Sequence, residues 1–207
     1  MLTNILKIKG DWEEVVNDCR STVNKPSLGH EPSDRFKRSL LIAEHSPIRD
    51  ISIKWKWSNI KSWIATHWSR HKWECFIRTQ RSDRTGIPRD DLPQGAHVDF
   101  TGEANVQALI DTLRKRLCWQ AAPETHLYAE DLKATIAQKE PDIALVLVPN
   151  CVYRGACPEP NSCGEWTRFQ LWMNGRLFAT DQWAVPKTIE ERYELYRLYL
   201  TERKKTS

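Results

Sequence analysis

Alternating and helically spaced apolar residues divide the chain into strands and helices. Over residues 51–57, isoleucine and tryptophan alternate with serine and lysine, the pattern of a strand with one buried face. Residues 11–19 and about 102–117 instead repeat apolar side chains every three or four positions, which predicts amphipathic helices. Asp11, with Glu14 three residues later, can cap the first of these helices. The chain therefore combines strands with helices.

The same patterns predict further elements, each bounded by a proline, a glycine or a capping residue. They are helices over 58–71, 124–139 and 187–204, strands over 74–79 and 143–148, a hairpin in which Asn174-Gly175 joins 169–173 to 176–180, and loops over 25–34, 82–93 and 149–164.

These elements predict an α/β (α+β) fold in which an antiparallel or mixed sheet is flanked by helices. At 207 residues the chain can bury one sizeable core and is short for two ordinary domains, so we expect a single domain over 1–207. A cysteine-rich loop at 149–164 and a C-terminal helix at about 187–204 belong to it.

Composition and charge narrow the class of protein. Hydrophobic residues make up 40% and charged residues 28% of the chain, which is typical of a soluble globular protein. No apolar run approaches the roughly 18–20 residues of a membrane span, and no signal peptide precedes the first charged stretch, so we expect a cytoplasmic location. The net charge of +4 suits an anionic partner but does not separate a nucleotide from a nucleic acid.

Three cysteines, Cys151, Cys157 and Cys163, fall within a turn-rich segment. With a fourth ligand such as Cys118 or a histidine they could bind zinc, which favours tetrahedral sets of thiolates. Their five-residue spacings are not those of the usual CxxC knuckles, so we favour packed, reduced thiols and assign no metal.

Two basic clusters offer candidate anion-binding residues. Arg70-His71-Lys72 is followed by Ser82-Asp83-Arg84, and Arg89 comes soon after. Guanidinium groups bind phosphate oxygens bidentately, and several together offset the desolvation of a dianion. A solvated charged surface is the alternative for either cluster alone.

Taken with their neighbours, these clusters resemble the motifs of the flavin-dependent thymidylate synthases, and the chain is similar to a compact, phage-type member of that family. The family signature is RHR followed by Ser-x-Arg, and its other motifs have counterparts in the same order across about half of the chain. The corresponding segments are Cys19-Arg20-Ser21-Thr22, Glu44-His45-Ser46-Pro47, Arg70-His71-Lys72, Ser82-Asp83-Arg84, Arg89-Asp90-Asp91-Leu92-Pro93, and Asn105 to Leu109 with the trailing Arg116.

The resemblance implies reductive methylation of dUMP to dTMP in a homotetramer. FAD would be the cofactor, and methylenetetrahydrofolate and NADPH the co-substrates. A phage enzyme would act in the host cytoplasm. The resemblance assigns catalysis to Arg70, His71 and Arg116, flavin binding to Thr22, Ser46, Arg70, His71, Lys72 and Asn105, and dUMP binding to Ser82, Arg84, Arg89 and Arg116.

The sequence also departs from the family pattern. Lys72 replaces an arginine, Gln107 stands where a cation is expected, and only four residues separate Arg84 from Arg89, where the family carries a helical insert. Three alternatives therefore stay open: a pyrimidine nucleotide hydroxymethylase, a non-catalytic flavin- or nucleotide-binding protein, and a zinc-stabilised nucleic-acid binder that stacks bases on its tryptophans.

Overall fold

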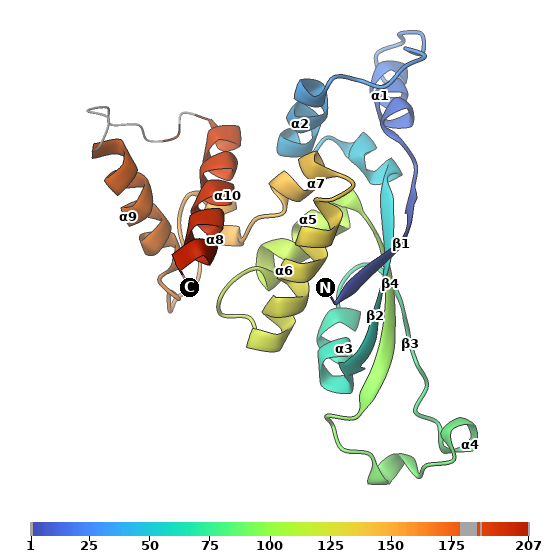
Figure 1. Ribbon diagram of the computed structural model, residues 1–207. Helices are drawn as coiled ribbons and strands as arrows, with labels where there is room; N and C mark the ends of the chain where they lie inside the picture. Colours follow the sequence, from blue (N-terminus) through green and yellow to red (C-terminus); the bar gives the residue numbers. More distant parts are fainter. Residues whose placement is uncertain (1, 179–185, 187, 207) are drawn as a thin grey trace.

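Four antiparallel strands form the sheet at the centre of the molecule (Figure 1). The computed structural model describes residues 2–178, 186 and 188–206. The strand order is β1-β2-β4-β3, so β2 (Ser52–Lys61) and β4 (His97–Asn105) are central, and β1 (Thr3–Lys9) and β3 (Glu74–Ile77) are the edges. The predicted α+β class is confirmed, with the sheet in its antiparallel form.

Helices cover one face of this sheet and build the rest of the molecule. Figure 1 shows α3, α5 and α6 beside the sheet, and α9 and α10 on the far side of that helical layer. The helices are α1 (Trp12–Ser21), α2 (Asp34–Ala43), α3 (Ser62–Ser69), α4 (Ser82–Thr85), α5 (Val106–Arg116), α6 (Pro123–Ile136), α7 (Pro141–Val146), α8 (Asn150–Arg154), α9 (Glu165–Phe178) and α10 (Ile189–Thr206), with 3-10 turns η1 (Ser46–Asp50) and η2 (Arg89–Asp91).

The buried face of the sheet is largely aromatic. Trp55 and Trp57 on β2 and Phe100 on β4 have no exposed surface. The rings of Trp57 and Phe100 stack with centroids 5.2 Å apart. Trp57 Nε1 donates to Thr3 Oγ1 at 2.7 Å, which gives the buried indole its acceptor and ties β2 to β1. The alternation over 51–57 therefore predicted this strand correctly.

Gly102 allows the ring of Trp55 to lie directly against β4. A Cβ at position 102 would come within 2.4 Å of Trp55 Cζ2, and this indole is fully buried. Such overpacking costs about 1–3 kcal/mol, so Gly102→Ala should lower the free energy of unfolding by that amount in chemical denaturation. Gly95→Ala is the matched control, because a Cβ there meets no atom within 4 Å. Equal losses in the two variants would contradict this packing.

The predicted helix over 58–71 begins later than expected. Strand β2 continues past Trp57 through an irregularity in its pairing with β4, and Asn59 there has a φ of 59°. The backbone N–H of Asn59 donates to Asp99 Oδ1 at 3.0 Å, which stabilises this turn of the strand. Ser58 is therefore a strand residue, and α3 begins at Ser62.

The predicted helix over 102–117 also begins too early, because its first four residues belong to β4. Helix α5 begins at Val106, and the Asn105 side chain caps it by accepting from the N–H of Ala108 at 2.9 Å. Neither β4 nor β1 was predicted. The elements predicted over 11–19, 74–79, 124–139 and 187–204 are confirmed as α1, β3, α6 and α10, with boundaries shifted by a few residues.

Two predicted β elements are wrong. Residues 143–148 lie mainly in the buried helix α7, which Pro141 starts at its first position. A short apolar run that is buried on all sides has no period to separate helix from strand. Asn174-Gly175 lies inside α9, so the hairpin is wrong for the residues up to 178, and its last two residues lie outside the described part of the chain.

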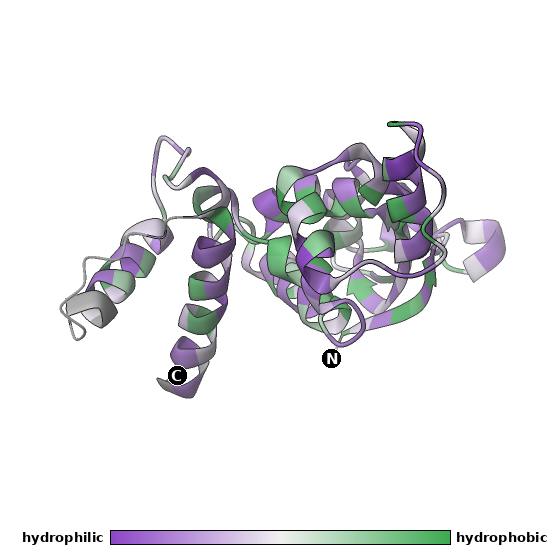
Figure 2. Cartoon of the chain, turned by 90° about the horizontal axis from the view of Figure 1, so that it is seen from above, coloured by the Kyte–Doolittle hydropathy of each residue, from purple (hydrophilic) through white to green (hydrophobic). Residues whose placement is uncertain are grey.

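The two C-terminal helices stand beside the body of the molecule, as Figure 2 shows from above. They are joined at Glu165, whose buried carboxylate pairs with Arg168 at 3.0 Å and with Arg203 at 3.1 Å. The predicted loop 149–164 contains the short helix α8, and its remaining residues are loop. In the described part of the chain, no helix has the length and apolar character needed to span a bilayer.

Candidate functional site

A cleft of about 670 Å³ opens along α5, and we call it the basic cleft. Its walls come from η1, from the turn that follows α3, from α5 and from α8. The lining residues are Arg49, Arg70, His71, Lys72, Asn105, Gln107, Ala108, Asp111, Thr112, Arg114, Lys115, Asn150, Tyr153 and Arg154.

The helical period of α5 places several of these side chains on one face. Ala108, Asp111, Thr112 and Lys115 are three or four residues apart and all line the basic cleft. The opposite face of the helix, with Leu109, belongs to the core. The helix is therefore a rigid wall between the core and the cleft.

Positive charge in the basic cleft is largely uncompensated. Arg49, Arg70, Lys72 and Lys115 form no ion pair with any carboxylate of the described residues. Asp111 is the one acidic residue of the lining, and it pairs with Arg114 at 3.7 Å. A concave surface with several unpaired cations concentrates positive potential and attracts anions.

His71 lines the basic cleft beside these cations and is a neutral ring in the folded chain. Burial, together with the neighbouring Arg116 and Lys115, lowers the pKa of His71 to about 4. Arg116 Nε donates to His71 Nε2 at 2.8 Å, so the neutral ring carries its proton on Nδ1. Arg116 also donates to the carbonyl oxygen of His67 at 3.0 Å, which fixes its position. His71 can therefore donate one hydrogen bond at neutral pH without adding charge.

Glu44 supports the side of the cleft that Gln107, Arg114 and Tyr153 line. Its carboxylate pairs with Arg114 and accepts from Gln107 Nε2 at 2.7 Å. The guanidinium of Arg114 lies over the ring of Tyr153 at 3.5 Å. Gln107, which stands where the family resemblance expected a cation, is thus engaged in supporting the wall.

The structure brings together four of the predicted site residues. Arg70, His71, Lys72 and Asn105 all line the basic cleft, although the Asn105 amide oxygen is occupied as the cap of α5. Arg116 lies behind His71 and does not line the cleft. Its contacts in this structure are those of a residue that positions His71.

The other predicted site residues lie elsewhere. Thr22 ends α1 and donates its hydroxyl to the carbonyl oxygen of Cys19, and Ser46 is an exposed residue at the start of η1. Ser82, Arg84 and Arg89 lie on the loop between β3 and β4, which projects beyond the sheet in Figure 1. None of the five lines the basic cleft.

Strand β3 separates this loop from the basic cleft. Its first residue, Glu74, pairs with Glu103 close to Asn105 and the cleft, and its last, Ile77, pairs with Phe100. A strand of four residues spans roughly 13 Å. Arg84 instead lines a second hollow of about 470 Å³ on the loop itself, with Arg78 and Leu92 among its neighbours. Within one chain, the two halves of the predicted nucleotide site are therefore apart.

Sequence reasoning missed four cations and one aromatic residue of the cleft: Arg49, Arg114, Lys115, Arg154 and Tyr153. Lys115 could have been found, because it lies eight residues after Gln107 on the same face of α5. Arg154 and Tyr153 could not, because α8 lies in a segment that was predicted to be a loop.

Cys118, which is distant in the chain, lies near the cysteines of the turn-rich segment. Burial and the neighbouring thiols of Cys118, Cys163 and Cys157 raise the pKa of Cys151 to about 12. All six cysteines are free. Within the described residues, no group of three or more histidine, cysteine or acidic side chains is arranged to hold a metal ion. Cys151 therefore packs as a protonated, small apolar side chain, and the zinc alternative stays a hypothesis.

The tryptophans offer little surface for stacking nucleic-acid bases. Trp12, Trp55, Trp57 and Trp68 are buried, and among the tryptophans of the described residues only Trp119 is more than a third exposed. The structure therefore gives the nucleic-acid alternative no row of aromatic platforms.

Comparisons with known proteins place the fold. No family model matches the chain, and no curated protein sequence matches it. Among solved structures, the chain resembles the UMP/dUMP methylase PolB from Streptomyces cacaoi bound with 5-Br dUMP. The TM-score is 0.57 and the identity 14%, over 70% of this chain and 93% of that one. The likeness shows a shared fold.

These comparisons correct the family assignment made from the motifs. The shared fold is that of a protein described as a UMP/dUMP methylase, and no model of the flavin-dependent thymidylate synthases matches the chain. That assignment is therefore wrong, and the FAD, the homotetramer and the phage origin that it implied lose their support. The motifs were short, and the structure places their binding residues on two separate surfaces.

Proposed function

We propose that the basic cleft binds a uridine monophosphate nucleotide and that the chain transfers a one-carbon group to its uracil ring. The observation that carries this proposal is the group of unpaired cations Arg49, Arg70, Lys72 and Lys115 in one cleft of a chain with the fold of a UMP/dUMP methylase. A nucleotide phosphate supplies the charge that these side chains lack.

Each part of the cleft has a role in this proposal. Arg70 and Lys72, which flank His71, bind the phosphate. The Nδ1–H of the neutral His71 donates to a uracil carbonyl oxygen. Activating uracil for attack on the carbon donor builds negative charge on the ring, which the fixed cations stabilise. No cysteine lines the cleft, so the proposed reaction uses no thiol nucleophile from the described residues. A methylenetetrahydrofolate-type molecule is the proposed carbon donor.

Binding is tested by calorimetric titration with dUMP and with UMP. We expect binding that weakens as salt rises, because the contacts are ionic. Arg70→Gln should weaken it about tenfold or more, since a hydrogen bond to a charged group contributes roughly 1.5–3 kcal/mol. Arg35→Gln on α2 is the matched control, because Arg35 is exposed and does not line the cleft. If neither nucleotide binds, or if the two variants behave alike, the proposal fails.

Arg84→Gln separates this proposal from the earlier motif assignment. Because Arg84 lies on the projecting loop, we expect nucleotide affinity in this variant to match the parent protein. Turnover is then followed by mass spectrometry of the nucleotide with methylenetetrahydrofolate, which distinguishes a methyl from a hydroxymethyl product. The assay is run with and without added FAD and NADPH, so that its result does not depend on any one cofactor assignment.

A further inference from the structure

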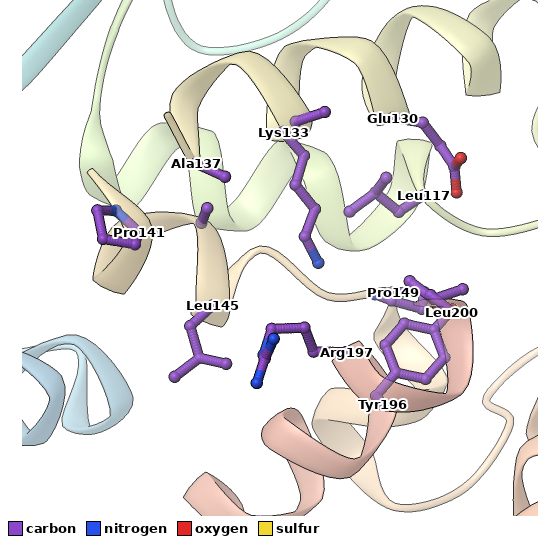
Figure 3. Close-up of a pocket in the computed structure, with 12 residues that line it drawn as sticks. Leu117, Glu130, Lys133, Ala137, Pro141, Leu145, Pro149, Tyr196, Arg197 and Leu200 are labelled. Atoms are coloured by element: carbon purple, nitrogen blue, oxygen red, sulfur yellow. The ribbon is translucent and has the colours of Figure 1, made fainter. Parts of the chain in front are cut away.

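A third hollow, of about 330 Å³, lies between the body of the molecule and α10 (Figure 3), and we call it the α10 cavity. It shares no residue with the basic cleft. Its lining comes from the end of α5, from α6, from α7 with the segment that follows it, and from α10. The lining residues are Leu117, Glu130, Lys133, Ala134, Ala137, Pro141, Ala144, Leu145, Pro149, Tyr196, Arg197 and Leu200.

Most of this lining is apolar. Leu117, Leu145 and Tyr196 are nearly fully buried, and small alanines of α6 and α7 leave the space between them. The hydroxyl of Tyr196 reaches Glu165 at 3.4 Å, so it is engaged outside the cavity and the ring contributes an apolar wall. Protein interiors rarely leave hollows larger than a few water molecules. Away from the three charged side chains of the lining, water in this hollow has few polar partners. Its volume is at the small end of the range for ligand pockets.

Two positively charged side chains extend into the α10 cavity from opposite walls. Figure 3 shows the side chains of Lys133, from α6, and Arg197, from α10, both directed into the hollow. The ion pair of Arg197 Nε with Glu194 at 2.8 Å orients this guanidinium. Glu130 is the one acidic residue of the lining and lies at the end near Leu117 in Figure 3. Two cations that converge over an apolar floor suit a carboxylate with a hydrocarbon body.

We infer that the α10 cavity is a binding site for a small amphipathic anion, a monocarboxylate with an apolar chain or ring. Its carboxylate would lie between Lys133 and Arg197, and its apolar part against Leu145, Tyr196 and Leu200. Such a ligand would connect α10 to α6 and α7. The site is independent of the proposed nucleotide function.

Titration of the full chain with octanoate, octanol and acetate tests this assignment. Octanoate should bind at least tenfold more tightly than either of the others, since octanol lacks the charge and acetate lacks the chain. Saturating dUMP should leave octanoate binding unchanged, because the two sites are separate. Competition by dUMP, or equal binding of octanol and octanoate, would overturn the assignment, as would the absence of octanoate binding.

Variants locate the bound molecule. Lys133→Gln and Arg197→Gln should each weaken octanoate several-fold and leave octanol unchanged, whereas Lys139→Gln, an exposed charge-matched control on the segment after α6, should change neither. Ala137→Phe, an exposed position at the edge of the lining, should fill the hollow and block both probes. Circular dichroism verifies that each variant is folded. Octanoate binding that survives Lys133→Gln, Arg197→Gln and Ala137→Phe contradicts the site.

Discussion

In an Arg116→Gln variant, the pKa of His71 should rise from about 4 toward 6.5, and nucleotide binding should weaken. Burial is the first cause of the low pKa and remains in the variant, so the pKa should rise only part of the way. The positive charge of Arg116 and the hydrogen bond from its Nε to His71 Nε2 are both lost. Glutamine keeps a polar side chain at the half-buried position.

NMR titration of the histidine ring signals measures this change directly. Lys115→Gln is the matched comparison, because Lys115 is the weaker of the two cationic causes and makes no hydrogen bond to the ring. We expect a smaller rise in the pKa of His71 in that variant. If the pKa is the same in the parent protein and in Arg116→Gln, then Arg116 does not control the protonation of His71.

The same shift makes stability depend on pH. The pKa of His71 is lower in the folded chain than in the unfolded chain, so the unfolded chain binds the proton more readily. The free energy of unfolding should therefore decrease as the pH falls from about 6.5 to about 4. In Arg116→Gln the part of this decrease that comes from His71 should be smaller, because the folded and unfolded pKa values lie closer together.

For the nucleotide, Arg116→Gln should act through His71. Without the donor on Nε2, the ring can rotate or change tautomer, and its Nδ1–H is no longer held in one orientation. We expect dUMP affinity to fall about tenfold and to become pH-dependent between roughly pH 5 and 7, as protonation of His71 enters that range. A loss of affinity without a new pH dependence would indicate a structural defect and not the loss of a positioning contact.

The sequence pattern predicted elements best where large buried side chains alternate with polar ones. Residues 51–57 were found because every second residue is a large apolar one. The strand β4 was missed because two of its inward positions are Gly102 and Ala104, which carry almost no hydrophobic signal although they are close-packed. Gly102 is small because Trp55 fills the space that a side chain would need, and that reason exists only in the folded molecule.

Only part of the candidate site was predicted, again because some of its features exist only in the folded molecule. Arg70 and Lys72 were found because consecutive basic residues signal an anion site by themselves. Arg49 and Arg154 reach the same cleft from η1 and α8, and nothing in the local sequence links those segments to the turn after α3. Conversely, Arg84 is close to Arg70 in the chain, but β3 carries the intervening backbone away from the cleft. Proximity in sequence was a poor guide to proximity in space.

Trp57→Ala should be among the most destabilising single substitutions in the chain. Its indole has no exposed surface, stacks on Phe100, and lies 4.8 Å from Trp68 between ring centroids. Removing a buried tryptophan costs about 3–5 kcal/mol, because the neighbours cannot fill the cavity. The variant also removes the donor that satisfies Thr3 Oγ1 and holds β1 to the sheet. Chemical denaturation, read from the shift in midpoint, measures the loss.

Two further variants divide that loss into its causes. Trp57→Phe keeps an aromatic ring in the stack but removes the bond to Thr3, so it should cost less, with about 1–3 kcal/mol for the unsatisfied hydroxyl and further loss from the smaller ring. Trp119→Ala removes an indole that is 40% exposed and should cost much less than Trp57→Ala. This order of stability losses matters for function. Helix α3 packs on the aromatic face through Trp68 and carries the turn with Arg70 and His71. If Trp57→Ala and Trp119→Ala lose the same stability, the aromatic face does not support the basic cleft, and the cleft is held in place by its other walls, η1, α5 and α8.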